Sequence, residues 1–262
     1  MYRAHFGLTR HTFAKDIAPE ELFISAAAKE LEARLNHLID LRGIGLITGE
    51  SGCGKTTICR KVATALHSGL YRVFYVPNST GNVMDLYKSV SWELGLPVER
   101  SRAALYRAIR GEVTRLCLES HLRPVLIVDE AHHLRSDVLE DLRLLTNYEM
   151  DSQSRLTLVL AGHPELRRRL GMAVHEALSQ RIIVRHHVLG LLHDELGAYL
   201  VHLLRRSGTE LPLFEPAAVH AIHQATAGLP RKVNLLAHHA LTAAALARAK
   251  VVTAEYVQAA MP

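Results

Sequence analysis

Eight consecutive residues, Gly49 to Thr56, read GESGCGKT and match the phosphate-binding pattern GxxxxGK[ST] in full. An apolar, strand-like segment precedes them and a helical pattern follows. Glycines in such a loop let backbone N–H groups turn toward phosphate oxygens, and the positive end of the following helix adds to the attraction. Lys55 is expected to reach the β- and γ-phosphates of ATP, and the Thr56 hydroxyl is expected to ligate Mg²⁺. The predicted nucleotide-binding residues of this loop are Gly49, Glu50, Ser51, Gly52, Cys53, Gly54, Lys55, Thr56 and Thr57.

A site that hydrolyses a nucleotide also needs acidic residues, and the run PVLIVDEAHHL supplies two. Four apolar residues end in Asp129 and Glu130, so both acids emerge at the carboxyl edge of a buried strand. Ligands of open α/β sheets bind at that edge. Asp129 is expected to hold Mg²⁺ through water, and Glu130 is expected to polarise the attacking water as the catalytic base.

Strands and helices alternate up to about residue 189, which predicts an α/β fold with a parallel sheet covered on both faces. Only helical patterns follow. We therefore expect a nucleotide-binding domain with its N-terminal lead-in over residues 1–189 and a helical domain over residues 190–262. The predicted strands are residues 45–48, 71–77, 124–131, 156–162 and 181–188, and the main predicted helices are 29–41, 55–66, 83–94, 101–119, 137–148, 194–206, 216–226 and 231–248.

The composition is that of a folded, water-soluble protein: 48% of the 262 residues are hydrophobic and 22% are charged. No apolar run approaches the roughly 18 residues of a membrane span, and no signal peptide is visible, so a cytoplasmic location is expected. The three cysteines form no paired motif. The net charge of +5 favours an anionic partner only slightly. The 17 histidines lack metal-ligand spacing.

The order of the P-loop and the segments LIVDEAHHL, LVLAGHPELRRRL, LSQRIIVR and GLPRKVNLL resembles that of the ExeA-type AAA+ ATPases. These are related to the ATPases of bacterial transposition in the TniB, TnsC and MuB groups. The opening FGLTRHTF is similar to the N-terminal segment of the same family, so the likeness covers nearly the whole chain. The resemblance implies an AAA+ fold, a five-stranded parallel sheet followed by a small helical lid, and hydrolysis of ATP.

The same resemblance implies roles for further residues. His163 falls at the sensor-1 position, where family members carry an uncharged polar residue; alternatively it is a loop histidine that caps the next helix. Arg231 matches the sensor-2 motif of the lid, and an arginine at a helix start after a Gly-Leu-Pro break can swing onto a phosphate; the alternative is a surface arginine. Asn78 resembles the residue that restrains the catalytic glutamate, although PNSTGN also fits a plain turn.

An AAA+ site is completed by an arginine from the neighbouring subunit, which implies a homo-oligomer, a ring or a filament. Arg181, just before the fifth strand, is our candidate for this arginine finger. Arg185 is the second choice, and inside a strand it can instead face solvent.

Three uses of the nucleotide remain open: assembly on duplex DNA that marks a transposition target for a transposase, work in a secretion system, and a switch that contacts only proteins. We favour the first, because secretion members of the family carry a membrane anchor and a periplasmic portion after the ATPase, and this chain shows neither before Pro262. DNA contacts are expected from basic residues after the second strand, to phosphates rather than to bases; the alternative is a solvated helix face. The candidates are Lys88, Arg100, Arg102 and Arg107, with Arg110 nearby, and Arg167–Arg169 are assigned instead to a subunit edge.

Overall fold

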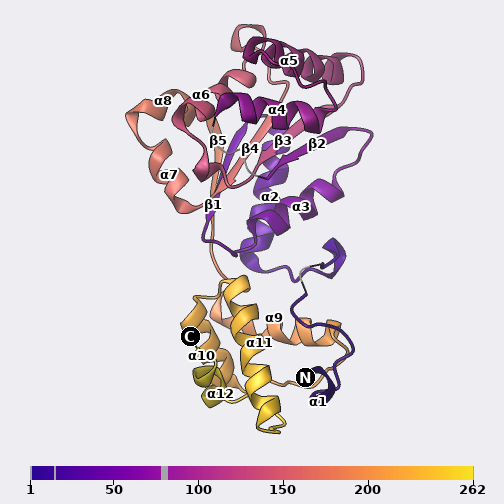
Figure 1. Ribbon diagram of the computed structural model, residues 1–262, viewed down its shortest axis with the longest axis vertical. Helices are drawn as coiled ribbons and strands as arrows, with labels where there is room; N and C mark the ends of the chain where they lie inside the picture. The colour runs from indigo at the N-terminus through magenta and orange to yellow at the C-terminus, as the bar shows by residue number, and fades with distance from the viewer. Residues whose placement is uncertain (1, 15, 78–81, 262) are drawn as a thin grey trace. The chain divides into compact units, whose positions relative to one another are not determined.

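The computed structural model describes residues 2–14, 16–77 and 82–261. The predicted role of Asn78 therefore lies outside the described residues. The packing of the chain divides it into two units (Figure 1). An α/β unit contains residues 30–50 and 55–188, and a helical unit contains residues 1–29, 51–54 and 189–262.

Five parallel strands form one sheet in the α/β unit, in the order β2-β3-β4-β1-β5. The inner strands β1, β3 and β4 are almost entirely buried, as their continuous apolar sequences require. The outer strands expose several residues each. The bounds are Ile44–Gly49 (β1), Tyr71–Val76 (β2), Arg123–Val128 (β3), Thr157–Gly162 (β4) and Ile182–Val188 (β5).

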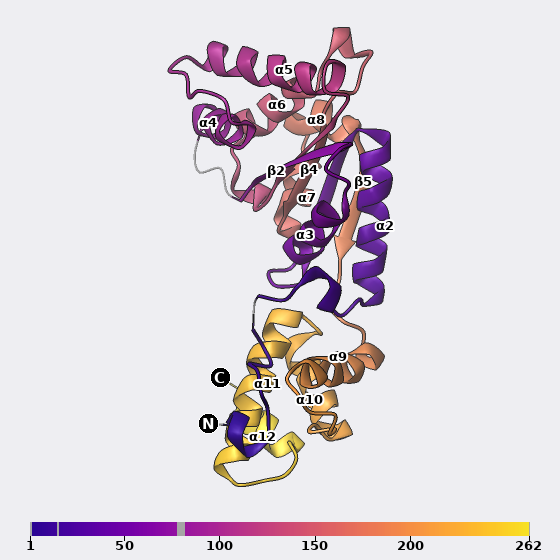
Figure 2. The same cartoon turned by 90° about the vertical axis from the view of Figure 1, so that its right-hand side faces the viewer.

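Helices cover both faces of the sheet, and the strand order explains which face each one takes. The chain crosses from β1 to β2 in one direction and returns through β3, β4 and β5, so right-handed crossovers place the first helix on one face and the later helices on the other. Figure 2 shows α4, α5 and α6 together on one side and α2 on the other. The helices of this part are α2 (Ala26–Leu41), α3 (Lys55–Ala65), α4 (Val83–Leu94), α5 (Arg102–Leu118), α6 (Ser136–Leu145), α7 (Pro164–Leu170) and α8 (Glu176–Arg181).

The helical unit has its own apolar core. It is built from α9 (His193–Arg206), α10 (Pro216–Thr226), α11 (Pro230–Leu246) and α12 (Ala254–Ala259), together with the short α1 (Tyr2–His5). The N-terminal segment that we expected beside the α/β domain contributes to this core instead, because Tyr2, Phe6 and Leu8 are buried within it. No helix in the described part of the chain is long and apolar enough to cross a membrane.

The predicted fold class is confirmed, and all five predicted strands are present. The strand predicted over residues 124–131 ends at Val128, which leaves Asp129 and Glu130 in the loop after it. The short helices α7 and α8 were not predicted, because seven and six residues are too few for a clear apolar periodicity.

Candidate functional site

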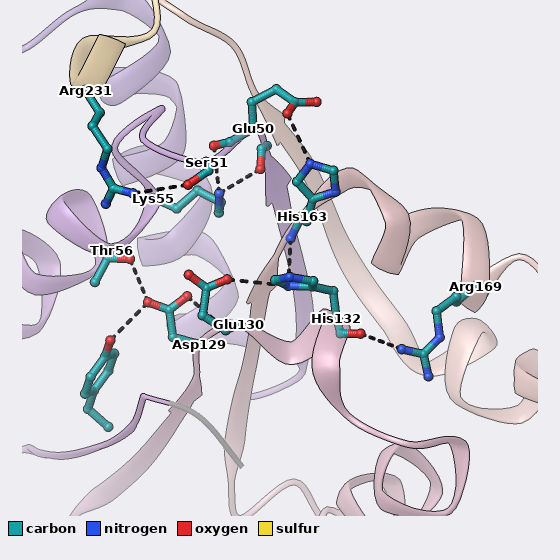
Figure 3. A network of polar contacts seen from close by, with 12 residues as sticks. Glu50, Ser51, Lys55, Thr56, Asp129, Glu130, His132, His163, Arg169 and Arg231 are labelled. Carbon is teal, nitrogen blue, oxygen red and sulfur yellow. Dashed lines mark hydrogen bonds and ion pairs between the residues drawn. The ribbon is translucent and has the colours of Figure 1, made fainter. Parts of the chain in front are cut away.

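Three polar segments meet at one edge of the sheet because they follow neighbouring parallel strands. The P-loop follows β1, Asp129 and Glu130 follow β3, and His163 follows β4. Thr48 of β1 pairs with Gly162 of β4, so these strands end side by side. Figure 3 shows the three segments facing one another. The structure therefore brings together residues that lie far apart in the sequence, such as Glu50 and His163, which are 113 positions apart.

The P-loop turns as its glycines require. Gly52 and Gly54 have φ angles of 81° and 103°, in the region that only glycine enters freely. Lys55 begins α3 and is 8% exposed. Its ammonium donates to the carbonyls of Gly49 at 2.7 Å and Glu50 at 3.1 Å. The loop carbonyls thus hold the lysine head group beside the loop, and Thr57 lies half-buried in the first turn of α3.

Arg231, in the first turn of α11, contacts the loop residues that belong to its own unit. Its guanidinium donates to the Ser51 hydroxyl at 3.1 Å, and its backbone N–H donates to the Gly52 carbonyl at 3.2 Å. A side chain at Gly52 has no room here, since an added Cβ would lie 2.4 Å from the Cβ of Arg231. The predicted sensor-2 arginine therefore touches the P-loop directly.

Replacing Gly52 by alanine should weaken nucleotide binding and lower the free energy of unfolding by about 1–2 kcal/mol or more, because it combines a left-handed φ with this clash. Gly111→Ala is the matched control. Gly111 lies inside α5 with nothing within 4 Å of an added Cβ, so this change should stabilise the chain by about 0.5–1 kcal/mol. Denaturant unfolding and titration with a fluorescent ATP analogue measure both effects. Equal stability of the two variants would contradict the close approach at Gly52.

A pair of hard oxygen ligands suited to Mg²⁺ lies beside the loop. The Thr56 hydroxyl donates to Asp129 Oδ2 at 2.6 Å, and Asp129 is 4% exposed. The same carboxylate accepts a hydrogen bond from the Tyr75 hydroxyl at 3.0 Å and from the Glu130 N–H at 2.8 Å. Burial and the neighbouring carboxylate raise the pKa of Tyr75, so the phenol stays a neutral donor. Hydroxyl and carboxylate oxygens at this spacing fit the coordination that Mg²⁺ prefers.

Glu130 has a left-handed backbone, with φ 50° and ψ 33°, which is uncommon outside glycine and concentrates at functional sites. One carboxylate oxygen lies 3.4 Å from Nδ1 of His132. That nitrogen also accepts the His163 backbone N–H at 3.3 Å. Burial and the adjacent His133 lower the pKa of His132. His132 is therefore neutral near pH 7, and it leaves the charge of Glu130 unpaired on this side.

His163 does not cap the helix that it precedes, since its side chain makes no capping hydrogen bond to α7. Its Nε2 lies 3.1 Å from Oε2 of Glu50 in the P-loop. The predicted sensor-1 residue is thus connected to the loop on one side and to His132 on the other. Its predicted role toward a phosphate stays a prediction.

Arg181 lies at the amino ends of the strands, whereas the P-loop lies at their carboxyl ends. It immediately precedes β5, whose first residue pairs with Ile44 at the start of β1, whereas the P-loop begins at Gly49 at the end of β1. Five residues of strand separate the two ends by about 17 Å. Arg181 forms an ion pair with Asp151. At this distance Arg181 is too far from the P-loop of its own chain to contact a nucleotide bound there. The second candidate, Arg185, donates to the Ser179 carbonyl at 2.6 Å.

The predicted basic cluster is smaller than its sequence indicates. Arg102 is bound through two nitrogens by Asp141, whose side chain is 4% exposed, and this ion pair raises the pKa of Arg102. Arg110 donates to the carbonyls of Asn147 and Leu144. Both guanidinium groups therefore already bind partners within the chain. The remaining exposed cations are Lys88, Arg100 and Arg107.

Three further residues of the site did not stand out in the sequence: Tyr75, His132 and Arg169. Arg169 donates to the backbone carbonyls of His132 and Leu134, both at 2.6 Å, and so fixes the loop that carries Glu130. We had assigned it, with Arg167 and Arg168, to a subunit edge, but its guanidinium is directed inward. The only sequence signals were the position of His132 two residues after Glu130 and the polar end of Tyr75 in the second predicted strand.

Comparisons with known proteins agree with this geometry. A family model described as an AAA domain matches residues 39–170, which is half of the chain. The chain is 37% identical over 247 residues to the general secretion pathway protein A of Aeromonas hydrophila, across 93% of this chain and 45% of that protein. It is 26% identical over 154 residues to the ATP-dependent target DNA activator B of Escherichia phage Mu, across 58% of this chain and 45% of that protein.

Among solved structures, Cdc6p from Pyrobaculum aerophilum superposes with a TM-score of 0.71 at 18% identity, over 95% of this chain and 69% of that one. At that identity the likeness shows the fold alone. The chain spans about half the length of the curated relatives that it matches.

Proposed function

This chain belongs to the family of AAA-domain ATPases and is an ATP-hydrolysing enzyme, and we propose that its nucleotide cycle controls assembly of a homo-oligomer on duplex DNA. The observation that carries the proposal is the position of Arg181 at the sheet edge opposite the P-loop. If Arg181 is the residue that completes the site, a second copy must supply it. Hydrolysis then requires assembly, because each site depends on an arginine from a neighbouring copy.

Within one subunit, we assign the binding of ground-state phosphates to Lys55 and the P-loop N–H groups. Thr56 and Asp129 would hold Mg²⁺, which when bound supplies positive charge to the phosphate oxygens. Glu130 accepts a proton from the attacking water and orients it. Among the described residues, the neutral His132 leaves Glu130 without a cationic partner. This supports the role, because a carboxylate neutralised by a histidinium would be a weaker base.

Two residues are proposed to contact the phosphates of the bound nucleotide and so to respond to its hydrolysis. Arg231 already contacts Ser51 and Gly52 and would move onto a phosphate from there. His163 would exchange Glu50 for the nucleotide or its water.

The proposed partner of the oligomer is duplex DNA, bound through its phosphates without sequence specificity. The exposed cations Lys88, Arg100 and Arg107 support this proposal, and a relative is named as a target DNA activator. With so few cations per subunit, a single chain binds weakly, and stacking subunits through ATP interfaces repeats the contacts along the backbone. The output would be regulation of transposition through a transposase.

With a non-hydrolysable ATP analogue, the protein should bind duplexes of any sequence and sediment with them as an oligomer, and without nucleotide it should bind weakly. Each phosphate contact adds about 0.9 to the negative log–log slope of affinity against salt, so binding should weaken steeply between about 50 and 200 mM. Replacing Arg100 and Arg107 together by alanine should lower this slope on every duplex. Fluorescence anisotropy over a salt series measures it.

The matched control removes the same charge elsewhere: Arg205 and Lys250, both exposed in the helical unit, are replaced by alanine. Arg102 is left intact in both variants, because its loss would leave the buried Asp141 carboxylate unpaired. A wild-type protein that hydrolyses ATP but ignores DNA at low salt would rule out the DNA proposal.

That outcome would favour a second candidate function, a role in secretion. The observation in its favour is the higher identity and wider coverage of the match to the general secretion pathway protein A, 37% over 93% of the chain, compared with 26% over 58% for the phage protein. The ATPase machinery and the trans position of Arg181 would be the same in either role.

A further inference from the structure

The turn before β4 holds an unfavourable backbone conformation. Glu149, Met150 and Asp151 have φ angles of 48°, 53° and 71°. Three consecutive residues with side chains thus occupy the region that favours glycine. We call these three residues the strained turn. Such conformations persist only where the surroundings over-determine them, and they cluster at sites that bind or switch.

Contacts on both sides hold the strained turn in place. Tyr148, which precedes it, is 2% exposed, and the guanidinium of Arg155 lies 5.4 Å from the centre of its ring. Arg155 also donates to Glu149 at 2.8 Å. On the other side, Arg181 forms its ion pair with Asp151. The turn is therefore ordered before any partner arrives, so docking it loses little conformational entropy.

The tip of this turn is an apolar side chain directed into solvent. Met150 is 100% exposed. A single exposed apolar residue needs no explanation, but this one is next to Asp151, which holds Arg181. Any surface that receives Arg181 must also face Met150. Under the proposed role of Arg181 in trans, the occupant of this face is a second copy of the chain.

A complementary groove lies at the carboxyl ends of the strands, beside the P-loop. It has a volume of about 660 Å³, and its lining includes the apolar Pro164 and Met172 and the cationic Arg167 and Arg168. Neither guanidinium forms an ion pair within the described residues. The groove also includes Glu50 of the P-loop. It thus offers apolar surface and positive charge next to the nucleotide site, opposite in sign to the carboxylates of the strained turn.

We propose that the strained turn of one copy docks into this groove of a second copy. Met150 enters beside Pro164 of the partner subunit, and Asp151 exchanges Arg181 for Arg167 or Arg168 of the partner subunit. The exchange releases Arg181 for the nucleotide of the partner subunit. The contact is head-to-tail, so it propagates into a ring or a filament. This inference rests on the proposed trans role of Arg181 and adds what releases that arginine.

The first test replaces Met150 by serine. This change should leave the folded monomer intact, because Met150 is 100% exposed. It should raise the protein concentration for half-maximal assembly in an ATP analogue by about 10-fold or more. Leu70→Ser is the matched control. Leu70 is 55% exposed at the same sheet edge but beside β2, at the far end of the strand order. Analytical ultracentrifugation measures both. Assembly of Met150→Ser at the wild-type concentration overturns the proposal.

The second test is a double-mutant cycle between Asp151→Asn, which tolerates the positive φ, and the combined change of Arg167 and Arg168 to glutamine. If the carboxylate and the two arginines pair across copies, each variant weakens assembly and the combination weakens it no further. Independent, additive losses would overturn the exchange of partners.

The two proposals fail in different ways. If wild type assembles in ATP and Arg181 acts in trans, but Met150→Ser assembles normally, only the docking of the strained turn is wrong. If wild type stays monomeric at all concentrations in ATP, the proposed function fails and the docking fails with it.

Discussion

Replacing Arg181 by alanine should leave the ATP affinity of each subunit unchanged and reduce turnover roughly 10³-fold or more, if the arginine acts as such fingers do in other NTPases. The expectation follows from the sheet register, which puts Arg181 about 17 Å from the P-loop of its own chain. An arginine that only reaches a neighbouring site cannot affect binding by an isolated subunit. It stabilises charge that develops when the phosphate is transferred.

A mixture of two inactive variants tests whether Arg181 acts on the neighbouring subunit. Arg181→Ala protein has an intact P-loop, and Lys55→Ala protein has an intact arginine, so mixed interfaces should recover part of the activity. Arg115→Ala is the matched control, because Arg115, like Arg181, is an arginine in an ion pair, here with Glu112. Its loss should not change turnover. Absence of recovery in the mixture, together with a monomer at every concentration, would exclude a finger in trans. Loss of activity in Arg185→Ala alone would transfer the role to the second candidate.

The Glu130→Gln variant should bind ATP and retain it, with turnover reduced by about 10²–10⁴-fold, whereas Lys55→Ala should not bind ATP at all. The two residues act on different states: Lys55 lies at the loop that receives ground-state phosphates, and Glu130 acts on the water. Because the glutamine keeps the size of the side chain, only the proton acceptor is lost.

Filter binding of labelled ATP and single-turnover hydrolysis separate these effects. Glu165→Gln serves as the control, since Glu165 is an exposed carboxylate on the nearby α7 and should leave both measurements unchanged. Hydrolysis by Glu130→Gln at the wild-type rate would contradict the catalytic assignment.

The sequence is sufficient to predict the strands of the sheet, the glycine-rich P-loop and the acidic pair Asp129 and Glu130, because apolar runs and motif spacing are local signals. It does not reveal which arginines are free. Arg102 and Asp141 lie 39 residues apart and meet only because α5 packs against α6. The same limit hides Tyr75 and Arg169, whose partners come from other elements. Helices α7 and α8 are too short to have a periodicity, and apolar anchors in the N-terminal segment do not reveal which core they join.

The place of β1 in the sheet also affects how the protein is made. β1 is the first strand in the chain, yet its partners are β4 and β5, more than 100 residues later. Loop closure over that distance is slow, and contacts of high sequence separation form late in folding. While the ribosome is still adding residues before β4, the emerging P-loop has no neighbouring strand to define its geometry. ATP binding during synthesis therefore reports a completed sheet, and a truncated nascent chain has no properly formed site in which to hold the nucleotide.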